Sequence, residues 1–264
     1  MHDRIDQHGR MKQMKQKAQI VSKWRVSAMR QSRGDQSRHA QGGKRNPDRT
    51  REVLLHAAFE EIHRTGFQAA SVDAILAHTG VTKGALYYHF PTKTDLGYAV
   101  VEEVIRQRIL QRWGHDVREG EDPIAHLIEK LSFEAKHRWP LEALQVGCPV
   151  NNLANEMSPI DEGFRQRIGQ VFHDWKSIIA RMIHQGQQSG HVRTDVKPEH
   201  VATFFVAAIE GTISMAKNGQ DLKLLRDNFA MLQTYLAALR PTPGTIPVSR
   251  TATRARRVGV RAAT

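Results

Sequence analysis

The sequence predicts an all-α fold, with an N-terminal three-helix head and a larger helical domain behind it. Apolar residues recur at helical spacing in most segments between residues 47 and 239, and no segment alternates as a half-buried strand does. Gly and Pro residues separate these segments. With 264 residues, 40% of them hydrophobic, the chain can form one large domain or two smaller ones.

The charge of the chain is distributed unevenly. The formal net charge is +12, of which residues 1–51 carry +10 and residues 240–264 carry +6, so residues 52–239 carry −4. Residues 1–45 have too few apolar side chains to form a core, which predicts a basic disordered extension. A basic disordered tail is predicted for residues 241–264. Such tails can add non-specific affinity for phosphates.

Several classes of protein are excluded by what the sequence lacks. No apolar run approaches the ~20 residues that span a membrane, and the N-terminus lacks the apolar region of a secretory signal. A lone cysteine, Cys148, excludes an intramolecular disulfide and any CxxC pair, so the cytoplasm is the expected location. No metalloprotease, P-loop, dinucleotide or nucleophile-elbow motif occurs, and the scattered histidines lack a third ligand. We therefore expect no catalysis, metal or cofactor.

The first predicted helix begins at Asn46-Pro47, with Asn as the N-cap and Pro at the first helical position. Leu55, Phe59 and Ile62 lie on one apolar stripe, and Gly66 ends the helix. We expect this helix to pack across the two that follow.

Residues 71–93, SVDAILAHTGVTKGALYYHFPTK, predict two short helices joined by a tight turn. Ser71 and Thr82 are suited to be N-caps, because their hydroxyls can accept from free backbone N–H groups. Gly80 stops the first helix where a left-handed residue is favoured, and the second begins at Lys83. A helix–turn–helix of this kind places its second helix in the DNA major groove.

A third helix should link this head to the rest of the chain. Pro91 ends the preceding helix, and Thr92 and Asp95 form a capping box. The helix is predicted to run to about Trp113.

The stretch GFQAASVDAILAHTGVTKGALYYHFPTKTDL resembles the N-terminal signature of the tetracycline-repressor (TetR) family, and the match covers roughly residues 47–105. The resemblance implies DNA contact by residues at the starts of the three helices and on the exposed face of the second. For Tyr88 the resemblance leaves two interpretations: the ring touches DNA, or it braces the head. The residues expected at DNA are Ser71, Thr82, Lys83, Gly84, Tyr87, Tyr88, His89 and Lys93.

Further helices are predicted over residues 123–139, 160–186, 198–217 and 222–239, with a shorter helical pattern over 150–157. The stretch GCPVNNLANE just after residue 146 fits the pattern G-C-P-x-x-N-L-A-x-E, which resembles one branch of the TetR family.

The last two helices carry more apolar residues than one buried stripe requires, which favours a four-helix interface with a second copy of the chain. The resemblance implies the same homodimer, and the alternative is that these residues only complete the monomer core. The candidate interface residues are Phe204, Ala208, Gly211, Thr212, Phe229, Leu232 and Leu236.

The middle helices are expected to enclose a mostly apolar cavity for a small-molecule inducer. The candidate lining residues are Trp113, Phe133, Cys148, Met157, Phe172 and Trp175. Aromatic and Met stripes at helical spacing also suit an ordinary core. Cys148 has two interpretations as well: a thiol that senses an electrophile from a helix start, or a small buried hydrophobe.

The expected organisation is a DNA-binding domain over residues 46–105 and a ligand-binding and dimerisation domain over residues 106–240. It predicts a sequence-specific regulator, a repressor released from a palindromic double-stranded DNA operator by a small apolar or electrophilic molecule, with no membrane partner. One alternative is an architectural DNA-binding protein that relies on its basic tails. The other is a small-molecule-binding dimer or enzyme with no role at DNA.

Overall fold

A computed structural model describes residues 47–114 and 121–241. These residues form helices and contain no strand, which confirms the all-α prediction. The predicted Asn46 cap and nearly all of both basic tails lie outside the described residues.

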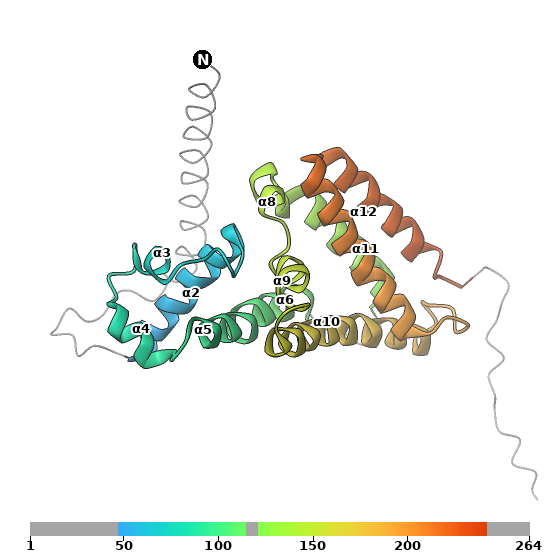
Figure 1. The fold of residues 1–264 in the computed structure, drawn as a ribbon. Helices are drawn as coiled ribbons and strands as arrows, with labels where there is room; N and C mark the ends of the chain where they lie inside the picture. Colours follow the sequence, from blue (N-terminus) through green and yellow to red (C-terminus); the bar gives the residue numbers. More distant parts are fainter. Residues whose placement is uncertain (1–46, 115–120, 242–264) are drawn as a thin grey trace, which may run out of the picture.

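The head consists of α2 (Pro47–Thr65), α3 (Val72–Leu76) and α4 (Lys83–His89), and it lies at one end of the molecule (Figure 1). Leu54 and Phe59 of α2 are buried with Ile75 of α3 and Leu86 of α4. Packing of α2 across the other two helices thus gives the small head a core of its own.

After a short break at residues 90–92, a continuous helical path leads from the head into the rest of the chain (Figure 1). The segments α5 (Lys93–Ala99), the π-helical η2 (Val100–Ile105) and α6 (Arg106–Trp113) follow one another directly. The predicted capping box is present: the Thr92 hydroxyl accepts from the Asp95 N–H at 3.0 Å, and the Asp95 carboxylate accepts from the Thr92 N–H at 3.0 Å.

The second part, here called the body, contains α7 (Pro123–Phe133), the π-helical η3 (Glu134–Arg138), α8 (Leu141–Val146), α9 (Pro149–Met157), α10 (Glu162–Gln188), α11 (Pro198–Gly219) and α12 (Leu222–Ala237). The long α10 packs against α6, α9 and α11, and α12 packs against α11 and α7 (Figure 1). No helix of the described ranges is long and apolar enough to cross a membrane.

Several helix boundaries differ from the sequence prediction, and α8 was not predicted as a helix. The long helix begins at Glu162 instead of residue 160, because the Asp161 side chain accepts from the Phe164 N–H at 2.8 Å and so caps it. The helix predicted over residues 123–139 changes to π geometry after Phe133.

Part of the predicted dimer interface needs correction. Thr212, Phe229, Leu232 and Leu236 are buried inside a single chain, with exposed fractions of 8%, 1%, 5% and 0%. These residues form the inward stripes of α11 and α12, so they are not available to a partner. Phe204 and Gly211 are exposed, and Ala208 is half-buried.

Candidate nucleic-acid interface and ligand cavity

The two short helices of the head begin at the predicted N-caps. The Ser71 hydroxyl accepts from the Ala74 N–H at 3.0 Å, and the Thr82 hydroxyl accepts from the Ala85 N–H at 3.2 Å. Gly80, between the helices, has a φ of +67°, a conformation that favours glycine. These local features fix the start of α4 and therefore the direction of its side chains.

Helix α4 turns two aromatic rings toward solvent. Leu86 and Phe90 are buried, whereas Tyr88 is 81% exposed and Tyr87 is 41% exposed. His89 is half-buried, and its ring lies 5.2 Å from that of Tyr88. Large exposed rings on one short helix suit contact with another macromolecule, because an isolated head would gain nothing from them.

The two lysines of the predicted interface have different surroundings. Lys83 Nζ lies 3.4 Å from Asp73 Oδ1, and because both side chains are exposed this pair is weak enough for a phosphate to replace. Lys93 Nζ donates to the Gln68 carbonyl at 3.1 Å and lies 4.8 Å from the centre of the Phe67 ring. Lys93 is therefore held in place at the start of α5.

The structure brings six of the predicted contacts together on α4 and its cap, with Ser71 at the start of α3 and Lys93 at the start of α5. His89 is half-buried, and the other five are exposed: Thr82, Lys83, Gly84, Tyr87 and Tyr88. A Cβ at Gly84 would meet nothing within 4 Å, so the backbone there is open to close approach.

Side chains of the body hold the turn between α2 and α3. The carboxylate of Glu156, on α9, accepts from the Phe67 N–H at 2.9 Å and from the Gln68 N–H at 2.8 Å. Gly66, which precedes this pair, has a φ of +89°. Because both donors belong to the head, α9 and the head are tied by two charge-assisted hydrogen bonds.

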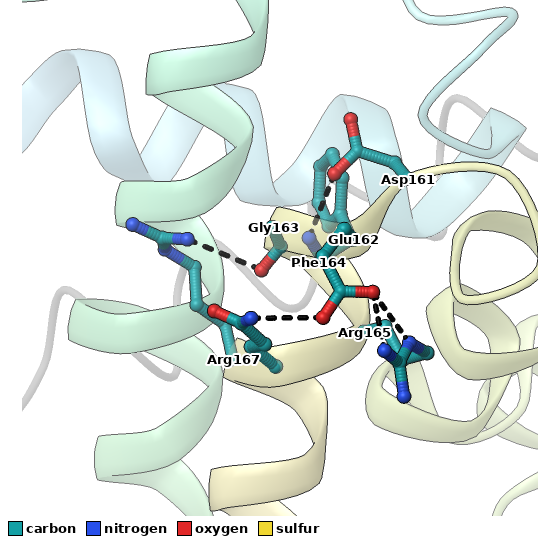
Figure 2. A network of polar contacts seen from close by, with 7 residues as sticks. Asp161, Glu162, Gly163, Phe164, Arg165 and Arg167 are labelled. Carbon is teal, nitrogen blue, oxygen red and sulfur yellow. Dashed lines mark hydrogen bonds and ion pairs between the residues drawn. The ribbon is translucent and has the colours of Figure 1, made fainter.

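The start of α10 forms a second connection to the head. Figure 2 shows the Asp161 carboxylate accepting from the Phe164 N–H, which caps the helix, and Arg167 donating to the Gly163 carbonyl at 3.1 Å. Asp161 also accepts from the Tyr98 hydroxyl of α5 at 2.8 Å, and the Arg167 guanidinium lies 4.0 Å from the centre of the Tyr98 ring. The Phe164 ring packs against Phe67 of the head at 4.7 Å.

A cavity of about 160 Å³, here called the junction cavity, lies between the head and the body. Its lining comes from α2, from η2 and α6, from the end of η3 and from α8, and from the turn between α8 and α9. The lining residues are Phe59, Glu60, His63, Arg64, Ile105, Arg108, Ile109, Arg112, Arg138, Trp139, Glu142, Ala143, Val146, Gly147, Cys148 and Pro149. A molecule in this cavity would touch both parts of the protein.

Only one of the six predicted pocket residues, Cys148, lines the junction cavity. Trp113 and Trp175 stack on each other with ring centres 5.3 Å apart, and Met157 is buried. Phe172 is half-buried against the core, and Phe133 is 52% exposed. The aromatic and Met side chains that suggested a pocket therefore belong mostly to the core.

The arginines of the cavity were not predicted from the sequence, although a signal was present. Arg108 and Arg112 lie three and seven residues after the buried Ile105, which places both next to the inward stripe of that helix. A charged residue at such a position needs a buried partner or a ligand.

His63 connects α2 to the turn beside Cys148. Burial lowers the pKa of His63 to about 4, so its ring is neutral at pH 7. Its Nε2 lies 2.9 Å from the Gly147 carbonyl, which can only accept, so the Nε2–H donates. Gly147 itself has a φ of +79°.

Cys148 is paired with a buried acid. Its side chain is 3% exposed, and Glu210 of α11, which is 6% exposed, lies beside it. Burial and the negative charge of Glu210 raise the pKa of the Cys148 thiol, although the residue does lie at the start of α9. A reactive thiolate needs a lowered pKa, so the structure does not favour the thiol-sensor hypothesis.

No group of His, Cys, Asp and Glu in the described ranges could hold a metal ion. An exposed helix with aromatic and basic side chains at one end, and a cavity with arginines at the junction, are both suited to recognition.

These features define a helix–turn–helix regulator, and comparisons with known proteins agree. Residues 54–100 match the bacterial regulatory proteins of the tetR family, and residues 133–232 match the tetracyclin repressor-like C-terminal domain. An uncharacterized HTH-type transcriptional regulator in the lacX 3' region of Lactococcus lactis is 30% identical over 185 residues, 70% of this chain and 92% of the relative. The chain belongs to the TetR family of transcriptional regulators, which typically act as ligand-responsive repressors.

A second sequence relative and a solved structure support the class of protein and the fold. The HTH-type transcriptional repressor DhaR of a Mycobacterium species is 27% identical, covering 63% of this chain and 82% of the relative. The crystal structure of a regulatory protein TetR from Rhodobacter sphaeroides superposes with a TM-score of 0.59 at 26% identity, over 72% of this chain and 97% of that structure.

Proposed function

We propose that this protein binds a palindromic operator as a homodimer and releases it when a small molecule fills the junction cavity. The observation that carries the proposal is the lining of that cavity, in which head residues such as Phe59 and His63 face body residues such as Trp139 and Cys148. A ligand that binds one arrangement of head and body better than the other shifts the population toward it.

The proposed DNA contacts divide by role. Thr82, Lys83, Tyr87 and Tyr88 on α4 and its cap would enter the major groove, and Gly84 would let the helix backbone approach. Ser71, Lys93 and His89 would contact phosphates and so fix the position of the head. The negative charge of residues 52–239 means that specificity would rest on these few side chains, with bulk positive charge left to the tails.

A dimer is typical of the family, and this chain has a surface that suits one. Helices α11 and α12 expose Phe204, Met215 and Met231, with exposed fractions of 50%, 60% and 65%. Apolar side chains of this size gain most when a partner covers them. We propose that these residues, with Gly211 and Ala208, form the interface with a second copy.

The dimer is tested with charge substitutions in full-length protein. Met215→Glu and Met231→Glu should shift sedimentation from dimer to monomer, because each would bury an unpaired carboxylate. Ile160→Glu is the matched control, since Ile160 is also exposed but lies between α9 and α10. Dimers that persist in both variants would contradict this interface.

The DNA role is tested by selecting bound sequences from a random library. We expect one palindrome whose half-sites are a helical turn or two apart. Tyr88→Ala and Lys83→Ala should weaken binding to it by about tenfold or more, since one good base contact is worth about 1–3 kcal/mol. Uniform coating without a selected sequence would instead support the architectural alternative.

The family consists of transcriptional regulators, which are not enzymes. A regulator of this kind acts on chromosomal DNA, so we place the protein in the bacterial cytoplasm as part of the same proposal.

A further inference from the structure

The arginines of the junction cavity carry information about the ligand. Four arginines and two glutamates contribute to the lining, together with apolar walls from Phe59, Ile105, Ile109 and Val146. We infer that the cavity takes a small organic anion, a carboxylate with a short apolar body, held by Arg138 and Arg108. This inference deepens the proposed function, on which it rests for its regulatory meaning, and replaces the apolar or electrophilic inducer expected from sequence.

Two of the four arginines are already neutralised. Arg64 donates to Glu61 at 2.6 Å on the surface of α2. Arg112 forms a bidentate pair with Glu134, in which its Nε donates to Oε1 at 2.9 Å. Glu134 is 2% exposed, so this pair is a fixed part of the core.

The other two arginines are less well neutralised. Arg108 lies 4.0 Å from Glu60, at the limit of an ion pair, and its guanidinium stacks 3.8 Å from the centre of the Phe59 ring. Arg138 forms no ion pair with a carboxylate of the described residues. Glu142 also lines the cavity but forms no ion pair with either arginine.

The arginines of the cavity also repel one another. Burial lowers the pKa of Arg108; the charge of Glu60 opposes this effect and the charge of Arg138 adds to it. Arg138 is exposed as a whole residue, and its partial burial lowers its pKa; the charge of Arg112 adds to this effect and the charge of Glu134 opposes it. Like charges that converge on one cavity are unfavourable without a counter-charge, and a carboxylate between two guanidiniums supplies it with charge-assisted hydrogen bonds.

A second polar group belongs to a residue of the lining. Trp139 lines the cavity, is 7% exposed, and its indole N–H has no hydrogen-bond acceptor among the described residues. Buried donors are nearly always paired. A ligand oxygen would satisfy this donor, which the apolar walls cannot do.

The volume sets the size of the ligand. The junction cavity measures about 160 Å³, and an engineered cavity of about 150 Å³ in another protein holds benzene. The ligand should therefore have about six non-hydrogen atoms. Butyrate has this size and a single carboxylate, so it is a suitable probe.

The test measures binding to the full-length protein without DNA, so it does not depend on the operator. Isothermal titration calorimetry compares butyrate with its neutral analogues butyramide and butanol, with butylammonium, and with inorganic phosphate as an anion without an apolar body. We expect butyrate to bind about tenfold or more tightly than each of the others.

Variants identify the residues that hold the anion. Arg138→Gln and Arg108→Gln should each weaken butyrate binding about tenfold or more, and Arg138→Lys should retain part of the affinity. Arg181→Gln, an exposed arginine of α10, is the control and should bind as the wild type does. Circular dichroism verifies that each variant is folded.

Three results would overturn the inference: equal binding of butyrate and its neutral analogues, unchanged binding in folded Arg138→Gln and Arg108→Gln, or no binding of butyrate. Butyrate binding that leaves operator affinity unchanged would instead uphold the anion site and count against the proposed release mechanism. Failure to select an operator would count against the DNA role alone.

Discussion

At the scale of single residues, Glu210 of α11 is a buried acid that lowers the stability of the fold at neutral pH. Neither carboxylate oxygen has a hydrogen-bond partner among the described residues. Burial raises its pKa from 4.5 to about 7, against the opposing effects of Cys148 and Arg112. Between these two values the folded protein binds more protons than the unfolded chain, so Glu210 makes the free energy of unfolding fall as pH rises from 4.5 to 7.

We predict that Glu210→Gln removes this fall. Relative to the variant, wild-type protein should lose about 3 kcal/mol of stability across the window, because one pKa unit corresponds to about 1.4 kcal/mol. Denaturant unfolding of both proteins from pH 4.5 to 7.5 measures the difference.

His63 has the opposite effect on the pH dependence of stability. Burial lowers its pKa from 6.5 to about 4, so His63 lowers the free energy of unfolding as pH falls below 6.5. Its effect is common to both proteins and cancels in the comparison. Parallel stability profiles for wild type and Glu210→Gln would contradict the assigned pKa of Glu210.

Glu156 is one of the residues that attach the head to the body. Its carboxylate accepts from two backbone N–H groups of the α2–α3 turn. In Glu156→Gln one acceptor becomes an amide donor, which leaves one of these N–H groups unpaired. We predict a loss of about 1–3 kcal/mol in the free energy of unfolding.

Thermal and denaturant unfolding test the Glu156 prediction. Glu129→Gln, on the exposed side of α7, is the control and should leave stability within about 0.5 kcal/mol. Equal stability of wild type and Glu156→Gln would show that the contact is not needed to hold the head.

At the scale of elements, α4 allows folding and DNA binding to be separated. A Cβ at Gly84 meets nothing within 4 Å, and the residue lies inside a helix. Gly84→Ala should therefore leave stability unchanged or raise it by up to about 1 kcal/mol. We predict that the same change weakens operator binding, because the added methyl group would lie where the helix meets DNA.

Gly169→Ala is the matched control for Gly84→Ala. Gly169 is exposed inside α10, with nothing within 4 Å of its added Cβ. It should gain stability in the same way without any loss of operator affinity. If both variants bind operator as the wild type does, α4 does not approach DNA closely at Gly84.

The elements differ in how well they could be predicted from the sequence. Local chemistry determines the caps, so Ser71, Thr82 and the Thr92–Asp95 box could be predicted, and α4 spans the residues expected. The π-helical η2 and η3 could not be predicted, because the same apolar spacing suits α geometry. The start of α10 was misplaced because Asp161, not an apolar residue, decides it.

The junction cavity and the dimer surface could not be predicted from local sequence patterns. The lining of the junction cavity comes from segments as far apart as Phe59 and Pro149, and no periodicity in either segment reports that they meet. On α12, apolar spacing indicated which residues are buried, as Phe229 and Leu236 are, but not whether the same chain or a partner buries them. Only the packed structure separates these possibilities.

At the scale of the whole molecule, the head and the body are joined by fixed contacts on two sides of one cavity. Glu156 of α9 holds the α2–α3 turn, His63 of α2 donates to the Gly147 turn, and α5 continues into η2 and α6. An anion between Arg108 of α6 and Arg138 of η3 would act on α2 through Arg108, which stacks on Phe59. Binding of the anion should therefore change the distance between the two α4 helices in a dimer.

The most direct measurement of this claim is the affinity for the selected operator as butyrate is added, with chloride adjusted to keep ionic strength constant because salt alone weakens DNA binding. The wild type should lose about 5- to 150-fold in affinity, the usual range of coupling between two sites. Folded Arg138→Gln should keep its affinity at the same butyrate concentrations. Unchanged wild-type affinity at concentrations that saturate the junction cavity would contradict the account.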